Sequence, residues 1–154
     1  MGEDGERYAD EIETLWNEAF AILDSRQDNQ DDLDSFYLGQ CYLGGKGVDQ
    51  DYEKAFAFCQ DSFDKIENLR NVTGKELGDM CWFDRVEGKD KEDAFPYYEA
   101  SFEAKKANSD DPSDVAARLA YCHRYGIGIE KDEAKAQSLM EEYSLTEDDL
   151  IHWK

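Results

Sequence analysis

Apolar residues recur every three or four positions along most of this chain, the spacing that places them on one face of an α-helix. Between residues 33 and 145 one pattern occurs three times, at offsets of 39 and 42 residues. Each copy has a leucine followed by a small residue, with an alanine 17 positions after the leucine: Leu38/Ala55, Leu77/Ala94 and Leu119/Ala136. The segments AFAFCQDSF (55–63) and AFPYYEASF (94–102) also match, so the chain contains an internal repeat.

Each copy predicts two helices joined by a loop. In the first helix, two small residues four positions apart lie one above the other and let a second helix approach closely. These pairs are Ser35/Gly39, Gly74/Gly78 and Ala116/Ala120. The second helix begins at an aspartate whose carboxylate caps its free amides, namely Asp51, Asp90 or Asp132. It is expected to bury Ala55, Phe58 and Phe63, then Ala94, Tyr97 and Phe102, and in the third copy Ala136 and Leu139. One helix pair cannot cover this apolar surface alone, so we expect the copies to stack.

The first copy resembles the Sel-1-like repeat, a branch of the tetratricopeptide-type solenoids. The resemblance rests on the pattern LGxxYxxGxGVxxDxxKA from Leu38 to Ala55. The third copy keeps it at Leu119, Gly126, Gly128, Ile129, Asp132, Lys135 and Ala136. The resemblance implies an all-α fold, an α-α superhelix of three degenerate helix–loop–helix repeats at 33–71, 72–110 and 111–145.

The second copy departs from the pattern in its loop and in its second helix. Asp84 and Val86 stand where the other loops have glycines, with Gly88 nearby. Pro96 falls about six residues into the second helix and lacks a backbone donor. We therefore expect a loop of different shape and either a kink or a delayed helix start.

The two ends predict one helix each. Residues 5–24 form an amphipathic helix whose apolar side is expected to turn inward as an end cap, and 5–32 comprise this acidic helix and its linker. A short C-terminal helix is expected within 146–154. The prediction is therefore a single domain, 1–154, of eight helices without a sheet.

Charge narrows the choice of partner. The 154 residues carry a formal charge of −21, and residues 1–32 hold eleven acidic against two basic residues. This balance disfavours direct binding to nucleic acid or an anionic membrane and favours a protein partner with a basic surface. No apolar run is long enough to span a bilayer, and no secretory signal opens the chain, so we expect a cytoplasmic protein.

Chemistry-bearing motifs are sparse. The four cysteines show no CxxC spacing and lie in apolar helical stretches, as reduced core residues do. His123 occupies the repeat position of Tyr42, which faces inward between helices, so we expect a packed side chain. No catalytic residue, metal ligand or cofactor is predicted, and the chain is not expected to be an enzyme.

The resemblance implies a binding surface on the concave face, which the first helices line. By position this face comprises Phe36, Gln40, Leu43, Lys75, Asp79, Trp82, Phe83, Tyr121, Arg124 and Tyr125. Trp82 and Tyr121 are expected to be its most exposed members. A peptide or helix laid here would find apolar anchors. In so short an array, these side chains can instead pack against neighbouring helices.

Three functions follow as hypotheses. The first is a protein-binding adaptor or regulator that uses the concave face. The second is an acidic inhibitor, a phage-type mimic of nucleic acid that blocks a basic nucleic-acid-binding partner. Its contact residues would be Glu11, Glu18, Asp28, Asp31 and Asp32. The third is an enzyme with His123 or a thiol in its groove. Neither the partner nor the oligomeric state is predicted.

Overall fold

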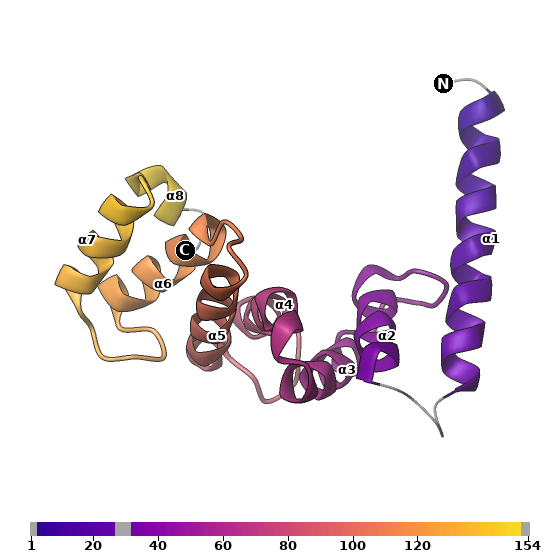
Figure 1. The fold of residues 1–154 in the computed structure, drawn as a ribbon, viewed down its shortest axis with the longest axis horizontal. Helices are drawn as coiled ribbons and strands as arrows, with labels where there is room; N and C mark the ends of the chain where they lie inside the picture. Colours follow the sequence, from indigo (N-terminus) through magenta and orange to yellow (C-terminus); the bar gives the residue numbers. More distant parts are fainter. Residues whose placement is uncertain (1–2, 27–31, 152–154) are drawn as a thin grey trace. The chain divides into compact units, whose positions relative to one another are not determined.

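The computed structural model describes residues 3–26 and 32–151, and the side chains of residues 10–26 and 33–150. Within these ranges the chain forms eight α-helices and no strand, which confirms the all-α prediction (Figure 1). It divides into two compact units, Met1–Lys65 and Ile66–Lys154. No helix in the described ranges is long and apolar enough to cross a bilayer.

The first unit holds three helices. They are α1 (Glu3–Ser25), α2 (Asp32–Gly44) and α3 (Tyr52–Lys65). The second unit holds five α-helices and two short 3-10 turns, η2 (Glu67–Leu69) and η3 (Lys91–Asp93). Its α-helices are α4 (Arg70–Trp82), α5 (Ala94–Ala107), α6 (Ser113–Tyr125), α7 (Glu133–Glu142) and α8 (Glu147–Ile151). The repeat pairs α2/α3, α4/α5 and α6/α7 each pack together, and α5 also packs on α6.

An aspartate begins the second helix of repeats one and three, as the pattern predicts, whereas in repeat two Asp90 caps the turn η3 that precedes α5. The Asp51 carboxylate accepts a hydrogen bond from the Lys54 amide, and the Asp132 carboxylate accepts one from the Lys135 amide. Asp90 caps η3 in a reciprocal arrangement with Asp93. These bonds satisfy backbone donors that have no partner inside the helix.

Small residues on the first helices let the second helices approach closely. A methyl group at Gly78 would lie 2.4 Å from the Tyr98 ring, and one at Gly39 would lie 2.8 Å from Cys59 Sγ. On α5 the fully buried ring is that of Tyr98. The sequence prediction that Tyr97 would be the buried ring of this helix was wrong by one position. Phe58 is likewise only half-buried in α3, where Cys59 is fully buried.

The loop of the second repeat has its own shape. Asp84 adopts φ +52° at the position that Gly45 occupies in the first repeat, and Gly88 adopts φ +73°. Val86 is buried in place of the second loop glycine. The turn η3 precedes α5, so Pro96 falls in the first turn of that helix, where its missing donor costs little. The sequence predicted either a kink in this helix or a delayed helix start, and the structure shows the delayed start.

Helix α1 differs from the inward-facing cap that the sequence predicted. Phe20 packs edge-on against Tyr42, with ring centroids 5.5 Å apart, and Lys46 lies over the Trp16 ring. Leu15 nevertheless remains 64% exposed. Ile12 and Ile22 are exposed as well. The apolar side of α1 is therefore only partly covered, because the described part of the first unit has no further helix to pack on it.

Candidate functional site

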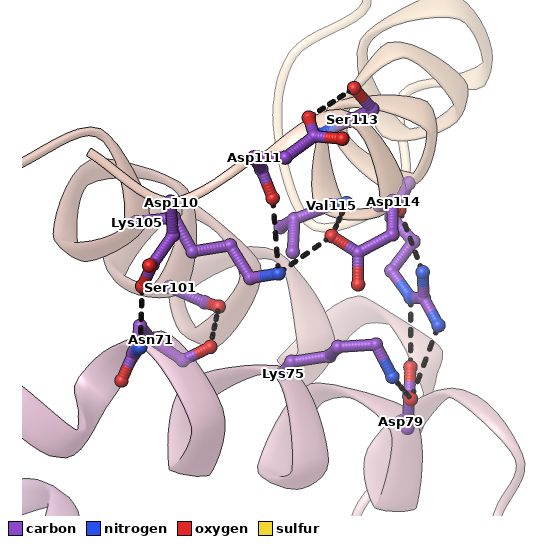
Figure 2. Close-up of polar contacts among 11 residues, drawn as sticks. Asn71, Lys75, Asp79, Ser101, Lys105, Asp110, Asp111, Ser113, Asp114 and Val115 are labelled. Carbon is purple, nitrogen blue, oxygen red and sulfur yellow. Dashed lines mark hydrogen bonds and ion pairs between the residues drawn. The ribbon is translucent and has the colours of Figure 1, made fainter. Parts of the chain in front are cut away.

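An ion pair joins the two first helices of the second unit, α4 and α6. Arg118 donates to Asp79 with both Nε and Nη2, at 2.9 and 3.2 Å. The same carboxylate accepts hydrogen bonds from Lys75 Nζ and from the Tyr98 hydroxyl, each at 2.9 Å. Figure 2 shows Lys75 and Asp79 on one helix, directed toward each other. Four donor atoms thus hold one carboxylate in place.

Burial makes this network rigid. The Arg118 side chain is 6% exposed, and its Nη1 also donates to the Asp114 carbonyl at 2.7 Å. Burial and the adjacent Asp79 carboxylate raise the pKa of Tyr98 well above its usual range, so its hydroxyl remains a donor. Such two-pronged arginine–carboxylate contacts fix geometry as well as charge.

Aromatic side chains lie beside this ion pair. The Trp82 ring meets the Tyr121 ring edge-on at 5.5 Å, and Tyr121 lies 4.4 Å from Tyr125. Tyr125 is 50% exposed and Phe83 49%, whereas Trp82 and Tyr121 are half-buried. The expectation that Trp82 and Tyr121 would be the most exposed was therefore wrong. The ring contacts join Trp82, Tyr121 and Tyr125, and Tyr125 is the exposed member of this cluster. Phe83 is exposed in the turn that follows α4.

Arg124 faces away from α4. Its Nε lies 3.1 Å from a Glu133 carboxylate oxygen, and its Nη1 lies 2.7 Å from one of Glu147. The hydrogen bond to Glu147 raises the pKa of Arg124, so it stays charged. This predicted contact residue thus connects α6 with α7 and α8.

The predicted residues of the first repeat lie in the other unit. Phe36, Gln40 and Leu43 are half-buried on α2. Phe36 and Gln40 line a groove of about 510 Å³ between α1 and α2. The complete lining is Trp16, Ala19, Ile22, Leu23, Phe36, Tyr37, Gln40, Cys41 and Lys46. We call this the α1–α2 groove.

The acidic residues of the inhibitor hypothesis are only partly covered by the structure. Glu11 and Glu18 are exposed on α1. Asp28 and Asp31 lie outside the described residues. Asp32 begins α2, but its side chain is outside the described set.

Comparison with known proteins identifies the repeat. The Sel1 repeat family model matches residues 35–60 and 113–142, which are the cores of repeats one and three. These two segments are therefore Sel1 repeats. A Sel1 repeat protein from Oxalobacter formigenes superimposes with TM-score 0.62 at 18% identity, covering 89% of this chain and 61% of that one.

A second solved structure shows the same fold. A protective antigen present in uropathogenic Escherichia coli strains, with an SLR fold, superimposes with TM-score 0.63 at 18% identity. The match covers 84% of this chain and 26% of that one, so this chain spans about a quarter of its length. The Sel1-like superhelix prediction is thereby confirmed. No curated protein sequence matches the chain.

The candidate catalytic groups are packed in the Sel1 repeats. His123 is half-buried with its ring edge-on to Phe95 at 5.4 Å, and burial lowers its pKa. Burial also raises the pKa of Cys122 to about 12, so its thiol is not a nucleophile near neutral pH. All four cysteines are buried and free, as predicted. No cluster of three or more metal-ligating side chains occurs among the described residues.

Sequence reasoning missed Arg118. The available signal was a lone arginine inside the apolar run VAARLA (115–120), where a charge requires a partner. Its partner Asp79 lies 39 positions earlier, three fewer than the 42-residue offset that relates α4 to α6.

Proposed function

We propose that this Sel1-like repeat protein is a non-catalytic adaptor that binds another protein through the α4–α6 surface. We define this surface by the exposed residues Phe83 and Tyr125 and the half-buried residues Trp82 and Tyr121. One observation carries the proposal. Two half-exposed aromatic rings, Phe83 directly after α4 and Tyr125 at the end of α6, lie on elements that a two-pronged ion pair joins.

The aromatic side chains of this surface are preorganised for binding. Aromatic rings offer a large contact area at a small cost in side-chain entropy, and they dominate binding energy at protein interfaces. The contacts of Trp82 with Tyr121, and of Tyr121 with Tyr125, hold the cluster before a partner arrives. A ligand therefore orders few side chains when it binds.

Net charge supports a partner with a basic surface. At −21 the protein attracts positively charged proteins and repels nucleic acid. The four buried thiols are those of a chain kept reduced, which supports a cytoplasmic place for this function.

Selection of displayed random peptides against the immobilised full chain tests the proposal. We expect selected peptides to carry apolar anchors and to lose affinity about tenfold or more when Phe83 and Tyr125 are both changed to alanine. Ile129→Ala is the matched control, because Ile129 is a 39% exposed apolar residue in the loop after α6. Equal affinity for the double variant and the control would refute the proposal.

The charge supports a second candidate, an acidic inhibitor that covers the nucleic-acid-binding surface of a basic protein. Glu11 and Glu18 are exposed on α1 and would contribute to that contact. Affinity for a basic partner would then fall steeply with salt and with Glu11→Lys/Glu18→Lys. A complex that forms equally well at low and high salt would eliminate this candidate.

A further inference from the structure

Helix α1 has the sequence pattern of a second helix of a repeat. The segments that align are AFAIL (19–23) in α1, AFAFC (55–59) in α3 and AFPYY (94–98) in α5. In α3 and α5 the alanine and the last residue of this segment are fully buried. The alignment assigns the same register to α1, although no first helix for it is present among the described residues.

The contacts of α1 match those of α5. A methyl group at Gly47 would lie 2.3 Å from the Trp16 carbonyl oxygen and 2.9 Å from Phe20 Cβ. A methyl group at Gly128 would lie 2.2 Å from the Glu92 carbonyl oxygen and 2.9 Å from Phe95 Cβ. The two glycines are equivalent loop positions of repeats one and three, and Phe20 aligns with Phe95.

The aromatic contacts agree as well. Phe20 meets Tyr42 edge-on at 5.5 Å and 89°, and Phe95 meets His123 edge-on at 5.4 Å and 84°. Tyr42 and His123 are equivalent positions of their repeats. Helix α1 therefore packs on the following repeat as α5 does.

One neighbour of α5 has no counterpart at α1. Helix α5 packs on its own first helix α4, which leaves Ala94 and Tyr98 with no exposed surface. The equivalent residues of α1, Ala19 and Leu23, are only half-buried, and the adjoining Ile22 is 60% exposed. Both Ala19 and Leu23 line the α1–α2 groove.

The α2 wall of the groove also corresponds to a surface that contacts a first helix in the second unit. In the second unit, α6 contacts α4 through Arg118 and Tyr121. The equivalent residues of α2 are Tyr37 and Gln40, and both line the groove. The α1–α2 groove thus corresponds to the position that a first helix occupies between α5 and α6.

We propose that the α1–α2 groove binds a basic amphipathic helix of a partner protein. In the second unit, α4 approaches Tyr97 and Tyr98 of α5 through two small residues four positions apart, Gly74 and Gly78. A helix that takes the equivalent place beside α1 is therefore predicted to carry small residues at the same spacing. This binding site is distinct from the α4–α6 surface and extends the proposed function.

Charge selects the occupant. Glu18 lies one helical turn from Ile22, which lines the groove, and Glu11 lies two turns farther along the same side of α1. The charged residue of the lining itself is Lys46. Lysine or arginine beside the apolar face of the incoming helix would pair with the two glutamates. A second copy of this chain carries −21 itself and is repelled.

The test uses a fluorescein-labelled helical peptide of about 15 residues. It carries leucines and two alanines four positions apart on one face, with lysines beside them. One control peptide replaces the two alanines with leucines, and another replaces the lysines with glutamates. Anisotropy with the full chain is expected to show binding of the first peptide at least about tenfold tighter than either control.

Variants locate the binding. Ile22→Asp is expected to weaken the lysine peptide about tenfold or more, and Glu11→Gln/Glu18→Gln to weaken it while leaving the apolar wall intact. Val72→Asp is the matched control, since Val72 is an exposed apolar residue of α4. Circular dichroism verifies that each variant is folded.

The outcomes separate this inference from the α4–α6 proposal. Phe83→Ala/Tyr125→Ala is expected to leave binding of the lysine peptide unchanged. Equal binding of the three peptides, or no effect of Ile22→Asp, would overturn the inference. A dimer in light scattering that Ile22→Asp dissociates would assign the groove to a second copy and would overturn it too.

Discussion

At the scale of single residues, Asp79 and Arg118 link the fold to the candidate site. A buried guanidinium is costly unless its donors are satisfied, and here three of its nitrogens have acceptors. The same bonds hold α6 beside α4, so stability and the shape of the aromatic surface depend on one contact.

Replacing Arg118 should destabilise the second unit. We expect Arg118→Met to lower the free energy of unfolding by about 2 kcal/mol, since Asp79 keeps Lys75 and Tyr98 as partners. Arg118→Lys should recover only part of this, because an ammonium cannot donate in the same two-pronged geometry. Urea denaturation is the measurement.

Lys65→Met provides the control, as it removes an exposed ion pair with Asp61 and should cost about 0.5 kcal/mol or less. Equal losses in Arg118→Met and Lys65→Met would show that the buried pair has no special role.

His123 predicts a pH dependence. Burial, reinforced by nearby Lys135 and opposed by Asp132 and Glu99, lowers its pKa. The unfolded chain then binds a proton more readily than the folded chain, so the free energy of unfolding falls as the pH drops below the ordinary histidine pKa of about 6.5. His123→Tyr introduces the residue of repeat one and lacks this contribution.

Urea denaturation at about pH 7.5 and about pH 5.5 should show a larger loss for the natural chain than for His123→Tyr. Parallel losses in the two proteins would indicate that His123 titrates alike in the folded and unfolded states.

At the scale of elements, the features predicted from sequence are those that adjacent residues determine. The aspartate caps of α3 and α7 and the small residues of the first helices were predicted correctly, whereas Asp90 caps η3 and not α5. Tyr98 and Tyr97 are adjacent aromatics, so helical spacing alone did not show which one faces α4. The exposure of α1 was also missed, because an amphipathic pattern requires a covering element but does not show that one is present.

Gly47 attaches α1 to the first repeat. We expect Gly47→Ala to separate α1 from the loop, since the added methyl group would lie 2.3 Å from the Trp16 carbonyl oxygen. Hydrogen exchange of residues 10–25 should then accelerate. Gly88→Ala is the matched control, with φ +73° against +72° but no atom within 4 Å of its methyl group. Similar exchange of α1 in both variants would contradict this role of Gly47.

At the scale of the whole molecule, the repeats explain which helix surfaces are covered and which are not. Each second helix packs on its own first helix and, in the case of α5, on the next. Helix α1 lacks a first helix of its own among the described residues, and its Ile22 remains 60% exposed. The family and fold could be predicted from the repeat pattern. The partner could not be predicted, because the sequence pattern does not show which apolar side chains remain exposed to contact it.

The most direct test of protein binding through the α4–α6 surface is a hydrogen-exchange footprint of a display-selected ligand on the full chain. The account predicts slower exchange at residues 79–85 and 117–125, with α7 unchanged. Protection confined to α5 and α7, with residues 79–85 exchanging as in the free protein, would contradict it.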